Sequence, residues 1–478
     1  MTARTASYSI DATNPYVGHR AHLPACYHLT EGQPLPANGK GVQAKWRSFW
    51  NLPSNNIRFR PICVQKVGGP GGTDISGILK NLEEANRLGF STCLQIRDDE
   101  PGMRSFAQAK AIIDQYWPPI MAGPARPDIV LYGNEPRLNN TSIDSDFFAQ
   151  RVSDIYEYLA EIDTQVLFAL VATADWLGYY EWCSKLLNKI GPKARRRTKI
   201  AVSHHYEARP SLAHQLNYAG FTKEWFPDGV CLMGEGGRTA WNFGQGALDS
   251  EIDSIRGGIF NAAHALENMM ANIGTCHYTL QNNVTVAGEK GNGMFSREEI
   301  EKPTVQAYRD FVAWITKSEM LNLTRDSWDS TGVFLAKNGK LVAYNWTPQD
   351  NADALTSYSR WLRMSSYAED NSHVSVGDVL SWAMGTGPQP SYAPLWEPDW
   401  TDAQDEYDTL TADRAASEKT ITVDVSGRGW TYFKFVSDDN VGEYMSHSGA
   451  PPSSSYNSST GILTLTLPRW SMLRGQFG

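Results

Sequence analysis

Residues 129–136 read IVLYGNEP, four apolar or aromatic residues followed at once by glycine, asparagine, glutamate and proline. A short apolar run that ends in turn residues is typical of a strand buried on both faces. A second run of this kind, VCLM at residues 230–233, is followed by Gly234 and Glu235. Each run therefore predicts a strand with a glutamate just beyond its carboxyl end.

Eight such runs alternate with amphipathic segments over the first two thirds of the chain. The expected strands are Ala25–His28, Ile57–Val64, Thr92–Ile96, Ile129–Tyr132, Val166–Val171, Ile200–His205, Val230–Met233 and Thr275–Thr279. The expected helices are Gly41–Trp50, Asp74–Leu88, Arg104–Met121, Ser145–Ile162, Leu177–Ile190, Ser211–Trp225, Leu248–Ile273 and Thr304–Thr316. Eight strand–helix units close a parallel barrel, so we predict a (β/α)8 TIM barrel over residues 1–317. A Rossmann-like open sheet is the structural alternative, but no GxGxxG follows the first strand.

From about Ser318 the pattern changes to short alternating segments separated by Asn-Gly, Ser-Gly and Pro-rich turns. The segments are Gly332–Leu335, Lys340–Trp346, Thr420–Val425, Thr431–Val436 and Gly461–Leu467. Asn338-Gly339 between the first two is typical of a two-residue hairpin. The sequence therefore predicts a C-terminal antiparallel β-sandwich over residues 318–478.

Composition narrows the class of protein. Apolar residues make up 41% and charged residues 20% of 478 residues, which is a globular balance large enough for two domains. With 43 basic and 52 acidic residues the net charge is −9, which argues against a nucleic-acid partner. The longest apolar stretch, Val166–Ala174, is too short to cross a membrane. No CxxC pair is present among six cysteines, which favours a reduced state.

The N-terminus has no apolar signal-peptide core. Two localisations stay open on this basis: an extracellular protein whose leader has been removed, or an intracellular protein. The sequence indicates no oligomeric state.

The two glutamates follow strands that lie three apart around the predicted ring, so they can face each other across the barrel mouth. Cleavage of an acetal linkage uses such a pair, one carboxyl group protonating the leaving oxygen and the other acting at the oxocarbenium-like carbon. Carboxyl groups about 5–5.5 Å apart allow direct attack and retention of configuration. Their surroundings must keep one protonated and the other ionised.

The run Gly133-Asn134-Glu135-Pro136 resembles the Asn-Glu-Pro signature that ends strand four in clan A glycoside hydrolases. The resemblance implies that Glu135 is the catalytic acid/base and that Asn134 binds the sugar 2-hydroxyl. It also implies that Glu235, which ends strand seven, is the catalytic nucleophile.

Three further motifs are similar to the same clan. Ser203-His204-His205-Tyr206 resembles its His-x-Tyr, which implies that His204 and Tyr206 line the site and that Tyr206 can hydrogen-bond the nucleophile. Arg58 and Arg60 resemble its strand-two arginine, and because they share a face the sequence does not choose between them. Residues 301–308 (EKPTVQAY) resemble the opening of the last barrel helix in members with a C-terminal β-sandwich, such as families 39, 30, 51 and 79, with family 39 the nearest.

One feature departs from that pattern. Many clan members end strand eight with a tryptophan that floors the sugar subsite, whereas residues 276–282 read CHYTLQN. Tyr278 in this strand, Trp176 after strand five and Trp241 after strand seven are the aromatic candidates for substrate binding.

The sequence leaves two alternatives to hydrolysis by paired glutamates. A metal-dependent barrel hydrolase could draw on His19, His22 and His204-His205, but barrel metal sites usually need His-x-His on strand one. A non-catalytic carbohydrate-binding barrel would not need both glutamates. The sequence thus predicts retaining hydrolysis of a β-linked glycoside, with carbohydrate as the partner and with no metal and no organic cofactor.

Overall fold

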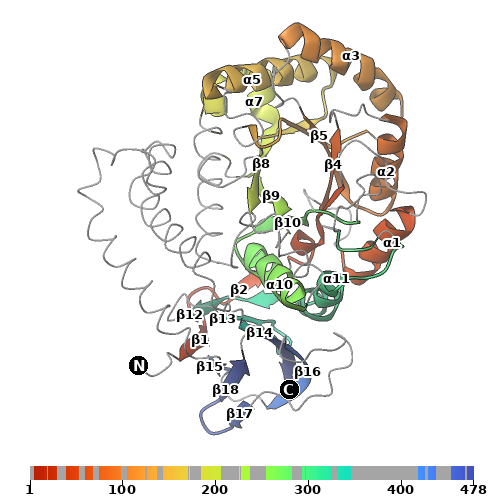
Figure 1. Cartoon of the computed structure of the whole chain (residues 1–478). Coiled ribbons are helices and arrows are strands. Elements are labelled where there is room, and N and C mark those ends of the chain that lie inside the picture. Colours follow the sequence, from red (N-terminus) through yellow and green to blue (C-terminus); the bar gives the residue numbers. More distant parts are fainter. Residues whose placement is uncertain are drawn as a thin grey trace.

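The computed structural model contains a closed parallel barrel of eight strands and a β-sandwich of two sheets (Figure 1). The structure describes residues 5–18, 20–29, 39–52, 60–67, 75–97, 105–123, 126–136, 144–170, 172, 183, 185–205, 226, 228–236, 255–281, 293–296, 298–325, 331–345, 418–425, 429–437, 454–468 and 471–478. Both predicted parts of the fold, the TIM barrel and the sandwich, are confirmed.

The barrel strands follow one another around the ring in chain order, and each pairs in parallel with its neighbours. They are β3 (Tyr27–Leu29), β4 (Ile62–Val67), β5 (Ser91–Ile96), β6 (Ile129–Tyr132), β7 (Leu167–Ala169), β8 (Thr198–His205), β9 (Val230–Gly236) and β10 (Ile273–His277). Because β10 pairs with β3, the ring is closed and no barrel strand is left as an open edge.

Helices lie outside this ring (Figure 1). They are α1 (Gly39–Phe49), α2 (Ile75–Arg87), α3 (Phe106–Ala122), α5 (Ser145–Ile162), α7 (Pro192–Arg197), α10 (Ile255–Met270), α11 (Pro303–Ala307), the π-helical segment η2 (Tyr308–Val312) and α12 (Ala313–Thr316). Ser105 caps α3 in a capping box with Gln108, and Asp144 caps α5, so side-chain oxygens satisfy amide groups of the first turns. The helix predicted over Ser211–Trp225 and the first part of that over Leu177–Ile190 lie outside the described residues.

Side chains of each barrel strand alternate between the lumen and the helix layer. Ile62 and Val64 of β4 belong to the apolar cluster inside the ring, whereas Cys63 between them belongs to a cluster under the helices. Ile200 and Val202 of β8 likewise point inward. The apolar cluster inside the ring fills the lumen, so the barrel has a packed core on which a polar layer can rest.

The turn that follows β6 has an unusual backbone. Gly133 has a φ of 92° and Glu135 a φ of 45°, and left-handed φ values are costly for residues other than glycine. A Cβ on Gly133 would lie 2.5 Å from Cζ of Phe148, so the turn requires glycine for space as well. The Glu135 amide donates to the Ala172 carbonyl at 2.8 Å, which anchors this turn to the neighbouring chain segment.

The sandwich has one sheet ordered β12-β1-β15-β18-β17 and another ordered β13-β14-β19-β16. The strands are β1 (Ala6–Ile10), β12 (Leu323–Arg325), β13 (Thr331–Leu335), β14 (Lys340–Asn345), β15 (Glu418–Asp424), β16 (Trp430–Ser437), β17 (Ser454–Asn457), β18 (Ile462–Pro468) and β19 (Ser471–Phe477). β13 and β14 form the predicted hairpin, with Gly339 at a φ of 84°. A two-stranded sheet pairs β2 (Tyr16–Gly18) with β11 (Met320–Leu321).

The N-terminal strand β1 belongs to the sandwich, not to the barrel. It pairs in parallel with β15 and antiparallel with β12, and Ala6 and Tyr8 join the core between the two sheets. The predicted boundary between residues 317 and 318 assigns β1 to the barrel domain, whereas the structure places this strand in the sandwich. Sequence alternation cannot reveal this placement because it gives the faces of a strand, not its partner.

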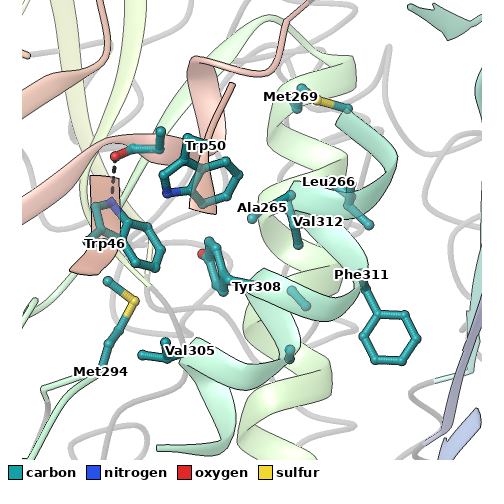
Figure 2. Packing of buried hydrophobic residues seen from close by; sticks show 14 of the residues in the cluster. Trp46, Trp50, Ala265, Leu266, Met269, Met294, Val305, Tyr308, Phe311 and Val312 are labelled. Carbon is teal, nitrogen blue, oxygen red and sulfur yellow. Dashed lines mark hydrogen bonds between the residues drawn. The ribbon is translucent and has the colours of Figure 1, made fainter. Parts of the chain in front are cut away.

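The barrel and the sandwich share one hydrophobic cluster. Trp46 of α1 and Trp50, which directly follows α1, meet Tyr308 of η2 tilted and edge-on, with ring centroids 5.4 and 6.1 Å away. Trp46 Nε1 donates to the Ala25 carbonyl at 2.8 Å (Figure 2). Phe334 and Tyr344 of the second sandwich sheet belong to the same cluster. The sheet is thus buried on both faces, against its partner sheet and against the barrel helices.

Polar contacts add to this junction. The Tyr344 hydroxyl donates to Glu267 Oε1 of α10 at 2.5 Å, and both side chains are buried. Among the described residues, none of the helices has the length and apolar character needed to cross a membrane. All six cysteines are buried and none forms a disulfide.

Replacing Gly133 by alanine should destabilise the fold more than the same change at Gly89. Both glycines have φ near 90°, so each alanine variant pays for a left-handed backbone, roughly 1 kcal/mol. Only at Gly133 does the new Cβ also meet a ring, because nothing lies within 4 Å at Gly89. Denaturant unfolding of both variants measures the difference, and equal losses of unfolding free energy would contradict the role assigned to Phe148.

Candidate active site

Glu135 and Glu235 lie at the same end of the barrel, at the carboxyl ends of β6 and β9. Both are buried, with exposed fractions of 9% and 3%. One oxygen of each carboxyl group and one ring nitrogen of His204 all lie within 4.8 Å of one another. Two acidic residues 100 positions apart in the sequence therefore converge on one imidazole.

A β-bulge in β9 determines which way Glu235 faces. Leu232 belongs to the apolar lumen and Met233 to the helix layer, so strict alternation would send Glu235 outward with Met233. Instead, Ser203 pairs with Met233 while His204 pairs with Glu235, so β9 has one residue more than β8 at this point. The extra residue is Gly234, and it turns Glu235 onto the inner face beside His204.

Close packing explains why this extra residue is glycine. A Cβ on Gly234 would lie 2.6 Å from Cγ1 of Val202 and 3.3 Å from Nε2 of His204. Both neighbours belong to β8 and face the lumen, so β8 and the bulge approach each other at backbone distance. The bulge and the position of His204 therefore depend on each other.

His204 Nδ1 lies between the two carboxyl groups. It is 2.7 Å from Glu135 Oε1 and 3.8 Å from Glu235 Oε2, and the His204 ring is fully buried. The first distance is that of a hydrogen bond and the second that of an electrostatic contact. The resemblance implied that His204 lines the site, and the structure places its ring between the two carboxyl groups.

The cation beside Glu235 is Lys66, which the sequence did not indicate. The second barrel strand is β4 (Ile62–Val67), not Ile57–Val64, so Lys66 and not an arginine stands near its carboxyl end. Gln65 faces outward and accepts from Asn81 of α2 at 3.2 Å, which leaves Lys66 on the inner face. Its ammonium group contacts Glu235 Oε1, and both side chains are buried.

The expectation for Arg60 was wrong in its position. Arg60 precedes β4, at the amino end of the strand, and its guanidinium lies 3.7 Å from Asp128, which precedes β6. Both residues are therefore at the end of the barrel opposite to the glutamates. The other candidate, Arg58, lies outside the described residues.

His28 of β3 is a second polar neighbour that sequence reasoning missed. Its Nε2 lies 3.5 Å from Glu235 Oε1, and the ring is fully buried. Burial lowers the pKa of His28 to about 3, helped by the charges of Lys66 and His204 and opposed by Glu235. His28 is therefore a neutral imidazole at neutral pH.

The surroundings of Glu235 keep it ionised. Burial alone would raise the pKa of Glu235, but the attraction of His204 and Lys66, with a smaller contribution from His28 and a hydrogen bond from Lys66, outweighs burial. The pKa of Glu235 is thereby held well below its ordinary value. A buried carboxylate that stays ionised is suited to attack an electrophilic carbon or to stabilise positive charge.

Asn134 belongs to a second part of the polar layer. It is buried, and its Oδ1 accepts from Nε2 of Gln95 in β5 at 2.9 Å. The same Gln95 nitrogen donates to the Gly133 carbonyl at 3.2 Å, and Gln95 Oε1 lies 3.5 Å from His28 Nε2. Gln95 therefore links two parts of the site: the turn that carries Glu135, and His28, which faces Glu235.

Tyr278 is the one aromatic candidate that the described residues include. Its ring lies 5.1 Å from the His28 ring, and the Lys66 ammonium lies 5.3 Å from its centroid. This half-buried ring thus borders the group around Glu235. The predicted binding residues Tyr206, Trp176 and Trp241 lie outside the described residues.

Glu135, His204 and Glu235 are also the residues that could hold a metal ion, since each offers one ligand atom to the cluster. Carboxylate oxygens and imidazole nitrogen are ligands for several divalent cations. A cation there would face the Lys66 ammonium, which already contacts Glu235. The charges around the cluster therefore favour use of the two carboxyl groups without an ion.

Comparison with known proteins gives a likeness in structure alone. No family model matches the sequence, and no curated protein matches it. A glucosidase from Croceicoccus marinus has a TM-score of 0.58 at 11% identity, covering 100% of this chain and 99% of that one. A monomeric β-xylosidase from Caulobacter crescentus CB15 has 0.55 at 12% (98% and 99%), and a GH39 enzyme from Xanthomonas axonopodis pv. citri has 0.54 at 11% (100% and 98%). The shared fold covers both the barrel and the sandwich, which confirms the predicted architecture of family 39 and its relatives.

Substituting Gly234 by alanine should destabilise the protein because the new methyl group overlaps Val202. Overpacking of this kind costs about 1–3 kcal/mol of unfolding free energy. The double variant Gly234→Ala/Val202→Ala should lose less than the sum of the two single variants, since removing the Val202 methyl groups makes room. Chemical denaturation of the four proteins measures this coupling, and strictly additive losses would rule out the contact as the cause.

Proposed function

We propose that this protein is a retaining glycoside hydrolase that cleaves a β-linked oligo- or polysaccharide by double displacement. The observation that carries the proposal is the approach of Glu135 and Glu235 oxygens to within 4.8 Å at the carboxyl end of the barrel. Retaining enzymes hold their two carboxyl groups about 5–5.5 Å apart, whereas inverting enzymes need roughly 6.5–9.5 Å to admit a water molecule.

Glu235 is the nucleophile in this proposal. The contact with Lys66 and the attraction of His204 keep its carboxylate ionised despite burial. In the first step a Glu235 oxygen bonds to the anomeric carbon while the bond from that carbon to the leaving oxygen breaks. The apolar side chains that fill the lumen below Glu235 give a low dielectric, which strengthens these electrostatic interactions.

Glu135 is the acid/base. It donates its proton to the leaving oxygen in the first step, then removes a proton from the water that attacks the glycosyl-enzyme. His204 Nδ1 lies 2.7 Å from Glu135 and can donate to the carboxylate that remains after the first step. The same ring nitrogen also lies 3.8 Å from Glu235 Oε2, so one imidazole contacts both glutamates.

The activities of the structural neighbours support glycoside hydrolysis as the reaction class. These neighbours are a glucosidase, a β-xylosidase and a further neighbour with a TM-score of 0.51, an α-L-arabinofuranosidase from Thermotoga maritima. The three act on different sugars, so they support glycoside hydrolysis as a class and leave the sugar of this protein to experiment.

A metal-dependent hydrolase is the second candidate, favoured by the ligand cluster of Glu135, His204 and Glu235. The two proposals differ in their response to chelation. Activity on a panel of chromogenic glycosides that survives dialysis against EDTA supports the two-glutamate mechanism, and activity restored only by added metal supports the alternative.

The two glutamates should respond differently to replacement. Glu235→Gln replaces the nucleophilic carboxylate by a neutral amide, so no glycosyl-enzyme should accumulate on any substrate. Glu135→Gln should lower kcat/KM, which reports the first step, by about 10²- to 10⁴-fold on poor leaving groups but much less on dinitrophenyl glycosides, which need no protonation. Burst kinetics and a leaving-group series measure both effects. Wild-type rates in both variants would refute the assignment.

Lys66 should set the acid limb of the pH profile. The lysine lowers the pKa of Glu235, so in Lys66→Met this pKa rises and the nucleophile becomes protonated at higher pH. The acid limb of kcat/KM should move up by about 1 pH unit or more, while Lys66→Arg, which keeps the charge, should leave it nearly in place. An unshifted acid limb in Lys66→Met would show that this lysine does not control the nucleophile.

A further inference from the structure

The bulge in β9 begins at the same residue on both sides of the strand. Against β8, the register shifts between Met233 and Glu235. Against β10, Thr275 pairs with Met233 but His277 pairs with Gly236, so the register shifts after Met233 here too. Met233 is therefore the last regularly paired residue before the bulge, and its pairing determines where the bulge begins.

One buried side chain of α10 contacts both members of this last regular pair. Asn268 Nδ2 donates to Thr275 Oγ1 at 3.0 Å and to Met233 Sδ at 3.3 Å. A thioether sulfur has no proton to donate, so the atom of Asn268 that faces it must be the amide nitrogen. All three side chains are buried. A single amide thus joins the two strands at the start of the bulge.

Stability alone does not account for an asparagine at this position. Asn268 Oδ1 is buried, and among the described residues it has no hydrogen-bond partner. A buried acceptor of this kind costs about 1–3 kcal/mol, a cost that an apolar side chain would not have. What asparagine provides here is a directional contact to two strands, which leucine cannot make.

The helix that carries Asn268 is itself held between the barrel and the sandwich. Glu267, the preceding residue, accepts from the Tyr344 hydroxyl of the sandwich. Leu266 and Met269 of the same helix turn belong to the cluster that the barrel and the sandwich share (Figure 2). This turn of α10 is therefore a fixed support against which β9 and β10 can be positioned.

We propose that Asn268 is a positioning residue for the nucleophile, because its bonds to Thr275 and Met233 fix the start of the bulge that turns Glu235 toward the lumen. This inference rests on the proposed function, in which Glu235 is the nucleophile. Asn268 acts through the backbone of β9 and has no part in the polar layer around the glutamates. When its bonds are lost, the bulge is free to shift along β9, and Glu235 loses its direction.

Asn261 provides a matched control on the same helix. It is buried, and its Nδ2 donates to Thr304 Oγ1 at 3.1 Å. The bond is again from an asparagine amide to a threonine hydroxyl, but Thr304 belongs to α11 and not to a barrel strand. Asn261→Leu therefore reports the general cost of losing such a bond on α10 without altering β9.

The kinetic test uses aryl glycosides with poor leaving groups, for which the first step limits kcat. Rates are expressed per folded molecule, measured by near-ultraviolet circular dichroism. Asn268→Leu should lower kcat about 10- to 10²-fold, the effect of a misplacement of roughly 1 Å, and change KM by less than about threefold. Thr275→Val should also lower kcat, but only slightly when Asn268→Leu is already present. Thr275→Ser, which keeps the hydroxyl, and Asn261→Leu should both stay within about threefold of wild type.

A second measurement needs no substrate. The Tyr278 amide donates to the Gly236 carbonyl at 3.2 Å, directly beyond the bulge. In Asn268→Leu this amide should exchange with deuterium about 10-fold faster, because the register that forms its bond is no longer held. The Gly133 amide, which is bonded across β5 and β6, should keep its rate. Asn261→Leu should change neither amide.

Three results would overturn the proposal. They are equal kinetic losses in Asn268→Leu and Asn261→Leu, an unchanged kcat in Asn268→Leu despite faster exchange at Tyr278, and unchanged exchange at Tyr278. If the wild type cleaves no glycoside, the proposed function fails. The exchange rate of the Tyr278 amide then still decides whether Asn268 holds the bulge, so the two failures can be told apart.

Discussion

The contact between the Lys66 ammonium and the Glu235 carboxylate is the constraint on which this site depends. Neither charge could be buried alone, because an isolated ion in a protein interior costs several kcal/mol that only a close partner offsets. Lys66 comes from β4 and Glu235 from β9, so the pair forms only when the ring of strands is closed through β3 and β10. The burial of this ion pair therefore requires closure of the barrel.

That pair also depends on a departure from regular strand geometry. Alternation along β9 would place Glu235 among the helices, and the extra residue Gly234 returns it to the lumen. The turn after β6 shows a similar departure, with left-handed φ values at Gly133 and Glu135. Irregular backbone thus positions both Glu135, just after β6, and Glu235, near the end of β9, in directions that regular strands would not give them.

Much of the architecture could be predicted because apolar runs and helix caps are local signals. The β6 strand and α5 have the bounds that the sequence indicated, and the Asn338-Gly339 hairpin is confirmed. The second strand was placed too early because Ile57 and Phe59 alternate with arginines as a strand would, which hid Lys66. The bulge in β9 and the partner of β1 could not be predicted, since both depend on pairing with residues far away in the sequence.

The polar side chains around the two glutamates, of which only His204 was predicted, share a position in their strands that has a physical basis. Four polar residues are each the second-to-last residue of a barrel strand: His28, Lys66, Gln95 and His204. The residue two positions before each of them belongs to the apolar cluster inside the ring. The penultimate position is the last inward one that the parallel ladder still holds rigidly, and it sits directly above the packed lumen. The hydrogen-bonded strand holds the backbone of a polar residue at this position, and the apolar side chains of the lumen pack beneath its side chain. Low dielectric then makes each charge act strongly on its neighbours, which is why His204 and Lys66 together lower the pKa of buried Glu235.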